Sequence, residues 1–302
     1  MADGSRLRLA YLGPRGTFAE EAALLYRAEA QLVPFPSIAA VGTAVATGMA
    51  EQGVVPIENS LEGSVSATLD LLIHEGGLSI ATTGEGASGS LDLCLGGDQS
   101  GLVIRHELVL PVDHCLMVRP GTDPAQIRVL YSHPQALAQC QRFIERCFPK
   151  ADAMAALSTA AAVEEVMASA KPAGAIGTRR AAELYGAEIL AGGIQDDSPN
   201  ETRFVVLAGR DHARTGSDRT SLCFSIADDR PGALVAVLRE FAERRINLSK
   251  IESRPSRESL GRYIFLVDLE GHREDEVVRD AIAAIRPGVS LLKLFGSYPR
   301  HG

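Results

Sequence analysis

Short apolar runs alternate with amphipathic segments along most of the first two hundred residues. The run LRLAYL at 7–12 ends at a glycine, and Thr17 then precedes a segment with Glu20 three residues on. A threonine and a glutamate at that spacing are typical of a capping box at the start of a helix. Apolar strands that alternate with helices predict a parallel or mixed α/β sheet. The further strands expected are 31–35, 53–57, 108–118, 127–131, 153–157, 173–176 and 203–207, and the further helices are 37–49, 65–73 and 134–148.

The polar stretch GRDHARTGSDR at 209–219 interrupts this pattern and predicts a linker, because it lacks apolar periodicity and contains two glycines. Beyond it the pattern predicts strands at 220–226, 247–253, 262–269 and 290–295, with helices at 232–244 and 274–285. That order is βαββαβ, the ferredoxin-like arrangement. We therefore expect a first domain at 1–208, the linker at 209–219, a second domain at 220–296 and a tail at 297–302. Because so small a unit buries little apolar surface alone, we expect an oligomer.

Composition and charge exclude several classes of function. The 302 residues are 46% hydrophobic, and 30 basic against 38 acidic residues give a net charge of -8. The basic residues are scattered and tryptophan is absent, so neither a phosphate-binding face nor a base-stacking platform is expected. No apolar run is long enough to span a bilayer, and the N-terminus lacks the apolar core of a signal peptide. We expect a cytoplasmic protein that binds neither nucleic acid nor membrane, with its five cysteines reduced.

Polar clusters follow several of the predicted strands. They are Glu58 to Ser60, Ser132 with His133, Thr178 with Arg179, and Asn200 to Arg203. In open α/β sheets ligands bind at the carboxyl ends of strands, and small hydroxyls, amides and helix amino ends suit an anionic small molecule. Any one such serine or threonine can equally be a helix cap. The convergence of the clusters favours a binding site.

Other chemistries lack their sequence signals. His133 has no neighbouring ligand at metal spacing, and His106 and His114 lie eight residues apart without carboxylate partners. The G-x-x-G at 13–16 lacks the third glycine and the acidic residue of a dinucleotide site, and no G-x-S-x-G occurs. Cys115 and Cys140 lie within apolar runs and are expected in the core. We therefore expect neither a metal nor a cofactor.

Several strings of residues follow one another in the order of a known enzyme family. They are YLGPRGTF at 11–18, VVPIENSLEGSV at 54–65, ELVLPVDHCL at 107–116, SHPQALAQC at 132–140, NETRF at 200–204, and, further on, DRPGALVAVL and NLSKIESRP. With these strings the chain resembles the prephenate dehydratases, which make phenylpyruvate from prephenate on the way to phenylalanine. The resemblance implies a two-lobed catalytic domain with a type II periplasmic-binding-protein fold, followed by a ferredoxin-like ACT domain that senses an amino acid.

The resemblance also implies roles for individual residues. Thr202 corresponds to the essential threonine of the family and is expected to donate a hydrogen bond to the departing hydroxyl group, with Arg203 and Phe204 beside it as catalytic residues. Because alternate side chains of a strand point to opposite faces, Arg203 either clamps a substrate carboxylate from an irregular strand or forms a structural ion pair. The substrate-binding residues implied are Asn59, Ser60, Ser132, Thr178 and Asn200.

In the ACT domain the resemblance implies a site for L-phenylalanine as effector, placed at an interface of a homodimer or homotetramer. The residues implied are Gly232, Ala233, Leu234, Val235, Asn247, Leu248, Glu252, Ser253, Arg254 and Pro255. Two other functions stay open on the sequence. One is arogenate dehydratase, whose substrate carries an amino group in place of the keto group of prephenate. The other is a binding protein without catalytic activity, because a fold alone does not determine function.

One segment departs from the family pattern. Beyond GLSI at 77–80, up to and including the similar GLVI at 101–104, the chain carries about two dozen additional residues rich in glycine, serine and aspartate. Such a composition predicts a surface excursion, here at about 82–101. Arg15, within the first family string, is a further departure and is expected to be exposed.

Overall fold

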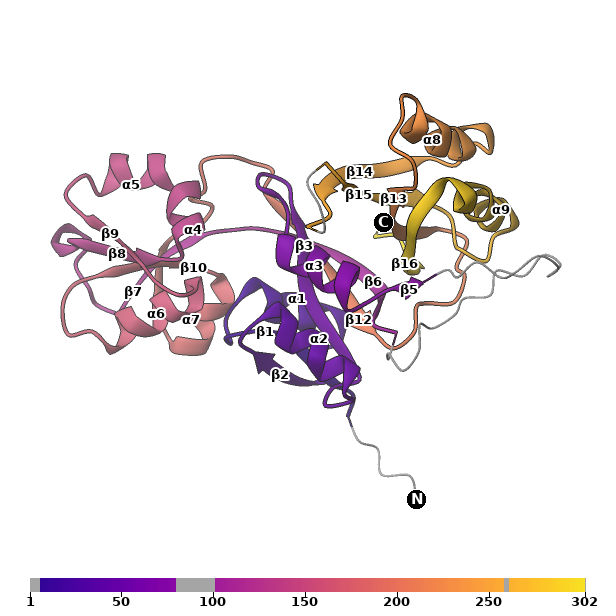
Figure 1. Ribbon diagram of the computed structural model, residues 1–302. Coiled ribbons are helices and arrows are strands. Elements are labelled where there is room, and N and C mark those ends of the chain that lie inside the picture. The colour runs from indigo at the N-terminus through magenta and orange to yellow at the C-terminus, as the bar shows by residue number, and fades with distance from the viewer. Residues whose placement is uncertain (1–5, 80–100, 258–260, 302) are drawn as a thin grey trace, which may run out of the picture. The chain divides into compact units, whose positions relative to one another are not determined.

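The computed structural model describes residues 6–79, 101–257 and 261–301, and the predicted excursion at 82–101 lies almost wholly outside them. Its first sheet has the strand order β2-β1-β3-β12-β6, with β4 paired to β3 (Figure 1). β1 and β2 pair in parallel, as the alternation of strands and helices predicted. The strands are β1 (Arg8–Leu12), β2 (Gln31–Phe35), β3 (Gln52–Asn59), β4 (Gly63–Ser64), β6 (Val103–Pro111) and β12 (Glu201–Ala208), and the helices of this part of the chain are α1 (Phe18–Tyr26), α2 (Ile38–Ala46) and α3 (Ser66–His74).

The second sheet has the order β11-β7-β10-β8-β9. Alternate residues of β7 face opposite layers, as strand geometry requires. Cys115 and Met117 pack with α6 and α7, whereas Leu116 and Val118 pack on the other side with α4. The strands are β7 (Cys115–Val118), β8 (Val129–Ser132), β9 (Asp152–Ala155), β10 (Gly174–Gly177) and β11 (Glu188–Ala191), and the helices are η1 (Pro124–Gln126), α4 (Pro134–Gln139), α5 (Gln141–Cys147), α6 (Thr159–Ala168) and α7 (Arg179–Tyr185).

The third sheet has the order β14-β15-β13-β16-β5, and the βαββαβ order predicted for the C-terminal unit is confirmed. Phe241 of α8 and Ile282 of α9 are fully buried in one apolar core with the strand residues Phe224 and Leu269. The strand β5, which precedes residue 80, pairs with β16 and adds a fifth strand to this sheet. The elements are β5 (Leu78–Ser79), β13 (Asp218–Ile226), α8 (Ala233–Glu243), β14 (Leu248–Pro255), β15 (Tyr263–Glu270), α9 (Glu276–Ile285), η2 (Arg286–Gly288) and β16 (Val289–Pro299).

The chain divides into two compact units. The first comprises residues 1–41, 54–65 and 108–204, and the second comprises 42–53, 66–107 and 205–302. The second unit therefore holds the βαββαβ module together with α3 and β5. Among the described residues, no helix has the length and apolar character needed to cross a membrane.

Some predicted elements differ from those observed. The strand expected at 108–118 is two strands, β6 and β7, separated at Val112 to His114. The helix expected at 134–148 is also two helices, because Cys140 leaves helical geometry with φ -118° and ψ 18°. β16 continues to Pro299, into the expected tail. The cap at Thr17 is confirmed, since its side chain accepts a hydrogen bond from the Glu20 amide, and Arg15 is exposed as expected.

Candidate active site

Two neighbouring strands, β3 and β12, bring the predicted catalytic and substrate-binding residues together. Consecutive residues on each strand form two cross-strand pairs of different kinds. The Asn59 Nδ2 lies 3.0 Å from the Thr202 Oγ1, and the Arg203 guanidinium lies 3.2 Å from the Glu58 carboxylate. Because adjacent side chains of a strand point to opposite faces, Thr202 and Arg203 are separated by the sheet. The ion pair supports the structural role for Arg203.

The orientation of the Asn59 side-chain amide follows from its neighbours. Its Oδ1 accepts hydrogen bonds from the backbone amides of Leu61 and Glu62, at 3.0 and 3.1 Å. Its Nδ2 therefore faces the opposite way, where it donates to the Asn200 Oδ1, to the Glu201 carbonyl and to the Thr202 Oγ1. A hydroxyl oxygen that accepts a hydrogen bond keeps its own hydrogen for donation elsewhere. Thr202 is half-buried and can present that hydrogen to a ligand.

Gln139, at the end of α4, extends this network and was not among the predicted site residues. Its Nε2 donates to the Glu62 carboxylate at 2.9 Å. Because an ionised carboxylate only accepts, the Gln139 Oε1 must face the other side, where it accepts from the Asn200 Nδ2 at 3.0 Å and meets the His114 Nε2 at 2.9 Å. The hydrogen bonds that connect the side chains of Glu62, Gln139, Asn200, Asn59 and Thr202 therefore have their donors and acceptors assigned without conflict. The network runs from the exposed Glu62 to the buried Asn59 and Asn200, and such a consistent set of hydrogen bonds fixes the orientation of its amide groups.

His114 is the second residue that the sequence reasoning missed. It is 3% exposed, packs edge-on against Phe18 with ring centroids 5.8 Å apart, and its burial lowers its pKa below the usual value of 6.5. The neutral ring carries its proton on Nε2, since that nitrogen faces the Gln139 oxygen. Its Nδ1 is buried and has no hydrogen-bond partner among the described residues. The site thus contains a neutral imidazole with one uncommitted lone pair.

Ser60 joins the same two strands through the backbone. Its amide donates to the Glu201 carbonyl at 2.8 Å, and its Oγ accepts from the Glu201 amide at 2.9 Å. The turn that follows β3 is thus fixed against the start of β12. Asn59, Ser60, Asn200 and Thr202 are therefore neighbours, as the clustering of polar residues at strand ends predicted.

The other predicted residues are engaged elsewhere. Ser132 is fully buried and its hydroxyl donates to the Ile176 carbonyl at 2.6 Å. Thr178 is also fully buried; it caps α7 by accepting from the Ala181 amide, and it donates to the Gly16 carbonyl at 2.8 Å. Phe204 is 2% exposed and belongs to the core, which favours packing as its contribution. Substrate contacts by Ser132 and Thr178 stay a prediction.

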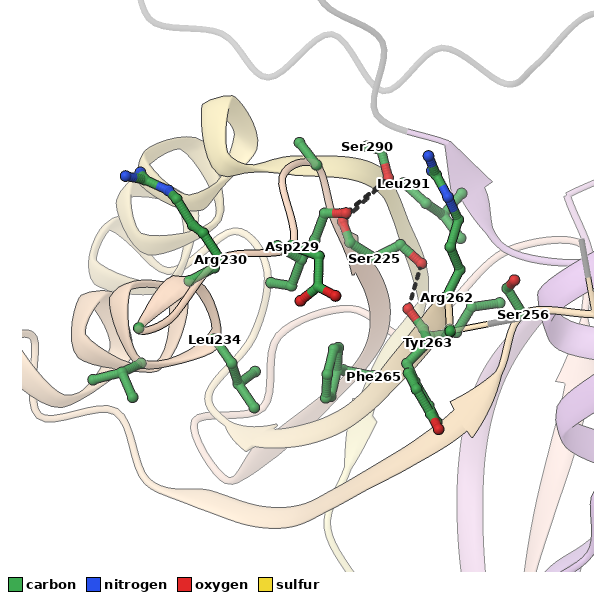
Figure 2. A pocket seen from close by; sticks show the side chains of 17 residues that line it. Ser225, Asp229, Arg230, Leu234, Ser256, Arg262, Tyr263, Phe265, Ser290 and Leu291 are labelled. Carbon is green, nitrogen blue, oxygen red and sulfur yellow. Dashed lines mark hydrogen bonds between the residues drawn. The ribbon is translucent and has the colours of Figure 1, made fainter. Parts of the chain in front are cut away.

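The C-terminal module contains a separate cavity of about 750 Å³ (Figure 2). Gly232 to Val235 line it, as predicted, together with residues of β13, β15 and β16. Gly232 precedes α8 with φ +86°, a conformation that favours glycine. The other predicted effector residues, which lie at Asn247, Leu248 and Glu252 to Pro255, are not among the residues that line this cavity.

The polar groups of the active-site network are not those typical of a metal-binding or nucleotide-binding site. Its members are amides, a hydroxyl, one carboxylate and one imidazole, and no group of three metal-ligating side chains occurs anywhere in the described part of the chain. Such groups can orient a small molecule and donate hydrogen bonds to a developing negative charge.

Comparisons with known proteins identify the family of the chain. The family model for prephenate dehydratase matches residues 9–212, and that for the ACT domain matches residues 223–287. A prephenate dehydratase of Mycobacterium tuberculosis is 39% identical over 306 residues, which covers 97% of this chain and 87% of that protein.

Two solved structures are also similar. A prephenate dehydratase of Arthrobacter aurescens, solved in complex with L-Phe, superimposes with a TM-score of 0.80 at 34% identity and covers 97% of this chain and 90% of its own. A protein described as GqqA, a novel type of quorum-quenching acylase, gives the same TM-score at 28% identity and covers 97% and 98%. The matched regions span the catalytic strings and the C-terminal module alike, and the chain belongs to the prephenate dehydratase family with a C-terminal ACT domain.

Proposed function

We propose that this chain is a carbon-oxygen lyase that converts prephenate into phenylpyruvate, carbon dioxide and water. The observation that carries the proposal is the contact between Asn59 and Thr202, in which the threonine oxygen accepts, so that the hydroxyl hydrogen is left to donate to a ligand. Because the chain belongs to the prephenate dehydratase family, we infer that prephenate is its substrate. An acyl-transfer reaction would need a nucleophile activated by a base, and Thr202 instead contacts amide groups.

The reaction requires the protein to stabilise the departing hydroxide. The bond between the ring and its carboxylate breaks, releasing carbon dioxide, and its electron pair enters the ring. The ring carbon-oxygen bond breaks, and the departing hydroxide takes up one proton from solvent to form water. Aromatisation drives the reaction, so neither an electron sink nor an oxidant is needed. Hydroxide is a poor leaving group, and a donor that stabilises it in the transition state contributes about 10²-fold to 10⁴-fold to the rate.

Thr202 is the donor in this proposal, and Asn59 positions it. The two amide hydrogens of Asn59 are shared among three acceptors of the chain itself, which favours a positioning role for Asn59 over direct binding of the substrate. Arg203 holds Glu58 on the other face and takes no part in this step. Gln139 and Glu62 keep the amide groups in the orientation that leaves the Thr202 hydrogen free.

L-Phenylalanine is proposed as the effector of the ACT domain. Arg230 and Arg262 line its cavity from different sides and can pair with a carboxylate, and Asp229 can pair with an ammonium group (Figure 2). Leu234 and Phe265 provide an apolar wall for an aromatic ring. Of the predicted residues outside this cavity, Ser253 and Pro255 are exposed, which is consistent with their reaching the cavity of a second copy in a homodimer or homotetramer, whereas Arg254 forms an ion pair with Asp70 of its own chain.

The experiment is a spectrophotometric assay of phenylpyruvate formed from prephenate by the purified protein, with arogenate as the second substrate. The proposal expects turnover of prephenate with the higher kcat/KM and inhibition by phenylalanine. Preference for arogenate would make the chain an arogenate dehydratase, and absence of turnover on both would favour a binding protein. An N-acyl amide substrate controls for the acylase chemistry of the similar structure.

A further inference from the structure

The helix α3 is held by three cationic side chains of the C-terminal module. Arg254 and Arg257 both contact Asp70, at 3.3 Å to Oδ1 and 2.9 Å to Oδ2, and Arg254 also donates to the Ser66 carbonyl at 3.4 Å. At the other end, the Lys293 ammonium donates to the Ile73 carbonyl at 2.7 Å and to the Gly76 carbonyl at 3.3 Å. A cation at the last carbonyls of a helix is also favoured by the helix dipole.

The chain beyond α3 is built into the same module. Leu78 of β5 pairs with Leu294 of β16 and packs against the buried core of the module. Gly77, at φ +77°, lies so close to the Leu294 carbonyl that an added Cβ would stand 3.2 Å from it. The helix is therefore fixed to the C-terminal sheet at both ends, by ion pairs at one and by strand pairing at the other.

Arg254, which forms an ion pair with Asp70, lies beside the effector cavity. Arg254 pairs across strands with Ile264, and the amide of Ser256 donates to the Arg262 carbonyl at 2.9 Å. Ser256, Arg262 and Ile264 all line the cavity. A ligand that shifts these residues therefore shifts the strand that carries Arg254.

At its N-terminal end, α3 follows the turn that connects β3 to β4 and carries Asn59. Only Val65 separates α3 from β4, and the Val65 amide donates to the Ile57 carbonyl at 2.9 Å. In β4, Gly63 pairs with Asn59 and Ser64 pairs with Glu58. The first turn of α3 is thus one residue along the backbone from β4, the strand that pairs with Asn59.

We propose that Asp70 is a positioning residue through which the ACT domain sets the geometry of the Asn59 turn, so that effector binding changes the affinity for substrate. The ion pairs of Asp70 with Arg254 and Arg257 are the contacts that differ between the effector-bound and the effector-free states. Coupling between two sites requires such a differential contact. The inference rests on the proposed function, since phenylalanine is the effector used to test it.

The test compares the KM for prephenate with and without saturating phenylalanine, and this ratio is the coupling factor. Removing the charge with Asp70→Asn should reduce the coupling factor toward one, a loss of about fivefold or more on the usual scale of such couplings. Phenylalanine binding, measured by calorimetry, should persist. Asp70→Glu should retain part of the coupling, which a purely structural role would not predict.

Two further variants keep the test decisive. Arg257→Gln removes one of the two ion pairs from a side chain that is 65% exposed, so it should fold and should lose part of the coupling. Glu270→Gln removes an ion pair with Arg300 in the same module and should leave the coupling unchanged. Wild-type coupling in both Asp70→Asn and Arg257→Gln would overturn this inference alone. A wild-type protein that neither binds phenylalanine nor is inhibited by it would overturn the proposed effector and this inference together.

Discussion

Asn59 on β3 and Thr202 on β12 meet through a hydrogen bond of 3.0 Å, although 143 positions of the sequence separate them. The bond uses the oxygen of the threonine and leaves its hydrogen for the substrate. On the opposite face of the same two strands, Glu58 and Arg203 form an ion pair. The two strands thus carry the proposed catalytic pair on one face and an ion pair on the other.

Replacing Gln139 should affect stability and turnover together. Gln139→Leu leaves the Asn200 Nδ2 and the His114 Nε2 without their shared acceptor. Each buried donor left unsatisfied costs about 1 to 3 kcal/mol. Chemical denaturation should show a lower free energy of unfolding, and kcat should fall because the amide chain loses its fixed orientation. Gln139→Glu is the matched control, since it keeps an acceptor for Asn200 and His114 but repels Glu62. A Gln139→Leu protein with wild-type stability and kcat would contradict the network.

Thr178 should prove structural. Thr178→Val removes both the cap of α7 and the hydrogen bond to the Gly16 carbonyl, so we expect a loss of about 1 to 2 kcal/mol in the free energy of unfolding. Thr178→Ser keeps the hydroxyl and should restore most of that stability. If Thr178→Val instead raises KM strongly at unchanged stability, the side chain binds substrate as the family resemblance implied.

Burial of neutral His114 predicts a pH dependence of stability. Its pKa in the folded protein lies below the usual 6.5, so between these two values the unfolded chain binds a proton that the folded chain does not. The free energy of unfolding should therefore fall as the pH falls below 6.5, by at most about 1.4 kcal/mol per pH unit from this group. His114→Gln keeps a donor for Gln139 and removes the titration.

The measurement is denaturant unfolding of wild type and His114→Gln between pH 5 and 8. The difference in stability between the two proteins should be constant above pH 6.5 and should shift in favour of His114→Gln below it. His106, whose pKa burial also lowers, is present in both proteins and cancels in the difference. A difference that does not vary with pH would mean that His114 titrates normally.

The sequence predicted the alternation of strands and helices and the βαββαβ order because both follow from local patterns. Asn59, Asn200 and Thr202 stand at strand ends, where ligand-binding residues gather, and the family strings contain all three. The alternation of side chains along a strand also anticipated that Arg203 points away from Thr202. For Thr178 the competing explanation, a helix cap, describes the contacts observed.

Gln139 and His114 were not predicted as site residues because their contacts depend on a helix break and on a partner distant in the sequence, neither of which the local pattern shows. QALAQCQRF reads as one continuous helix, and only the break at Cys140 places Gln139 at a helix end. The sequence around His114 offers no carboxylate partner that would indicate a metal site, and its actual partner is an amide 25 residues away. The signal that could have found both is their position inside the strings ELVLPVDHCL and SHPQALAQC.

The central claim is that the Thr202 hydroxyl stabilises the departing oxygen. The decisive measurement is kcat and KM for prephenate in Thr202→Ala and Thr202→Ser, with the free energy of unfolding measured in parallel. The claim predicts that Thr202→Ala folds, keeps KM within a few-fold and loses kcat by roughly 10²-fold or more, whereas Thr202→Ser recovers a large part of that loss. A folded Thr202→Ala protein that keeps kcat near the wild-type value would contradict it.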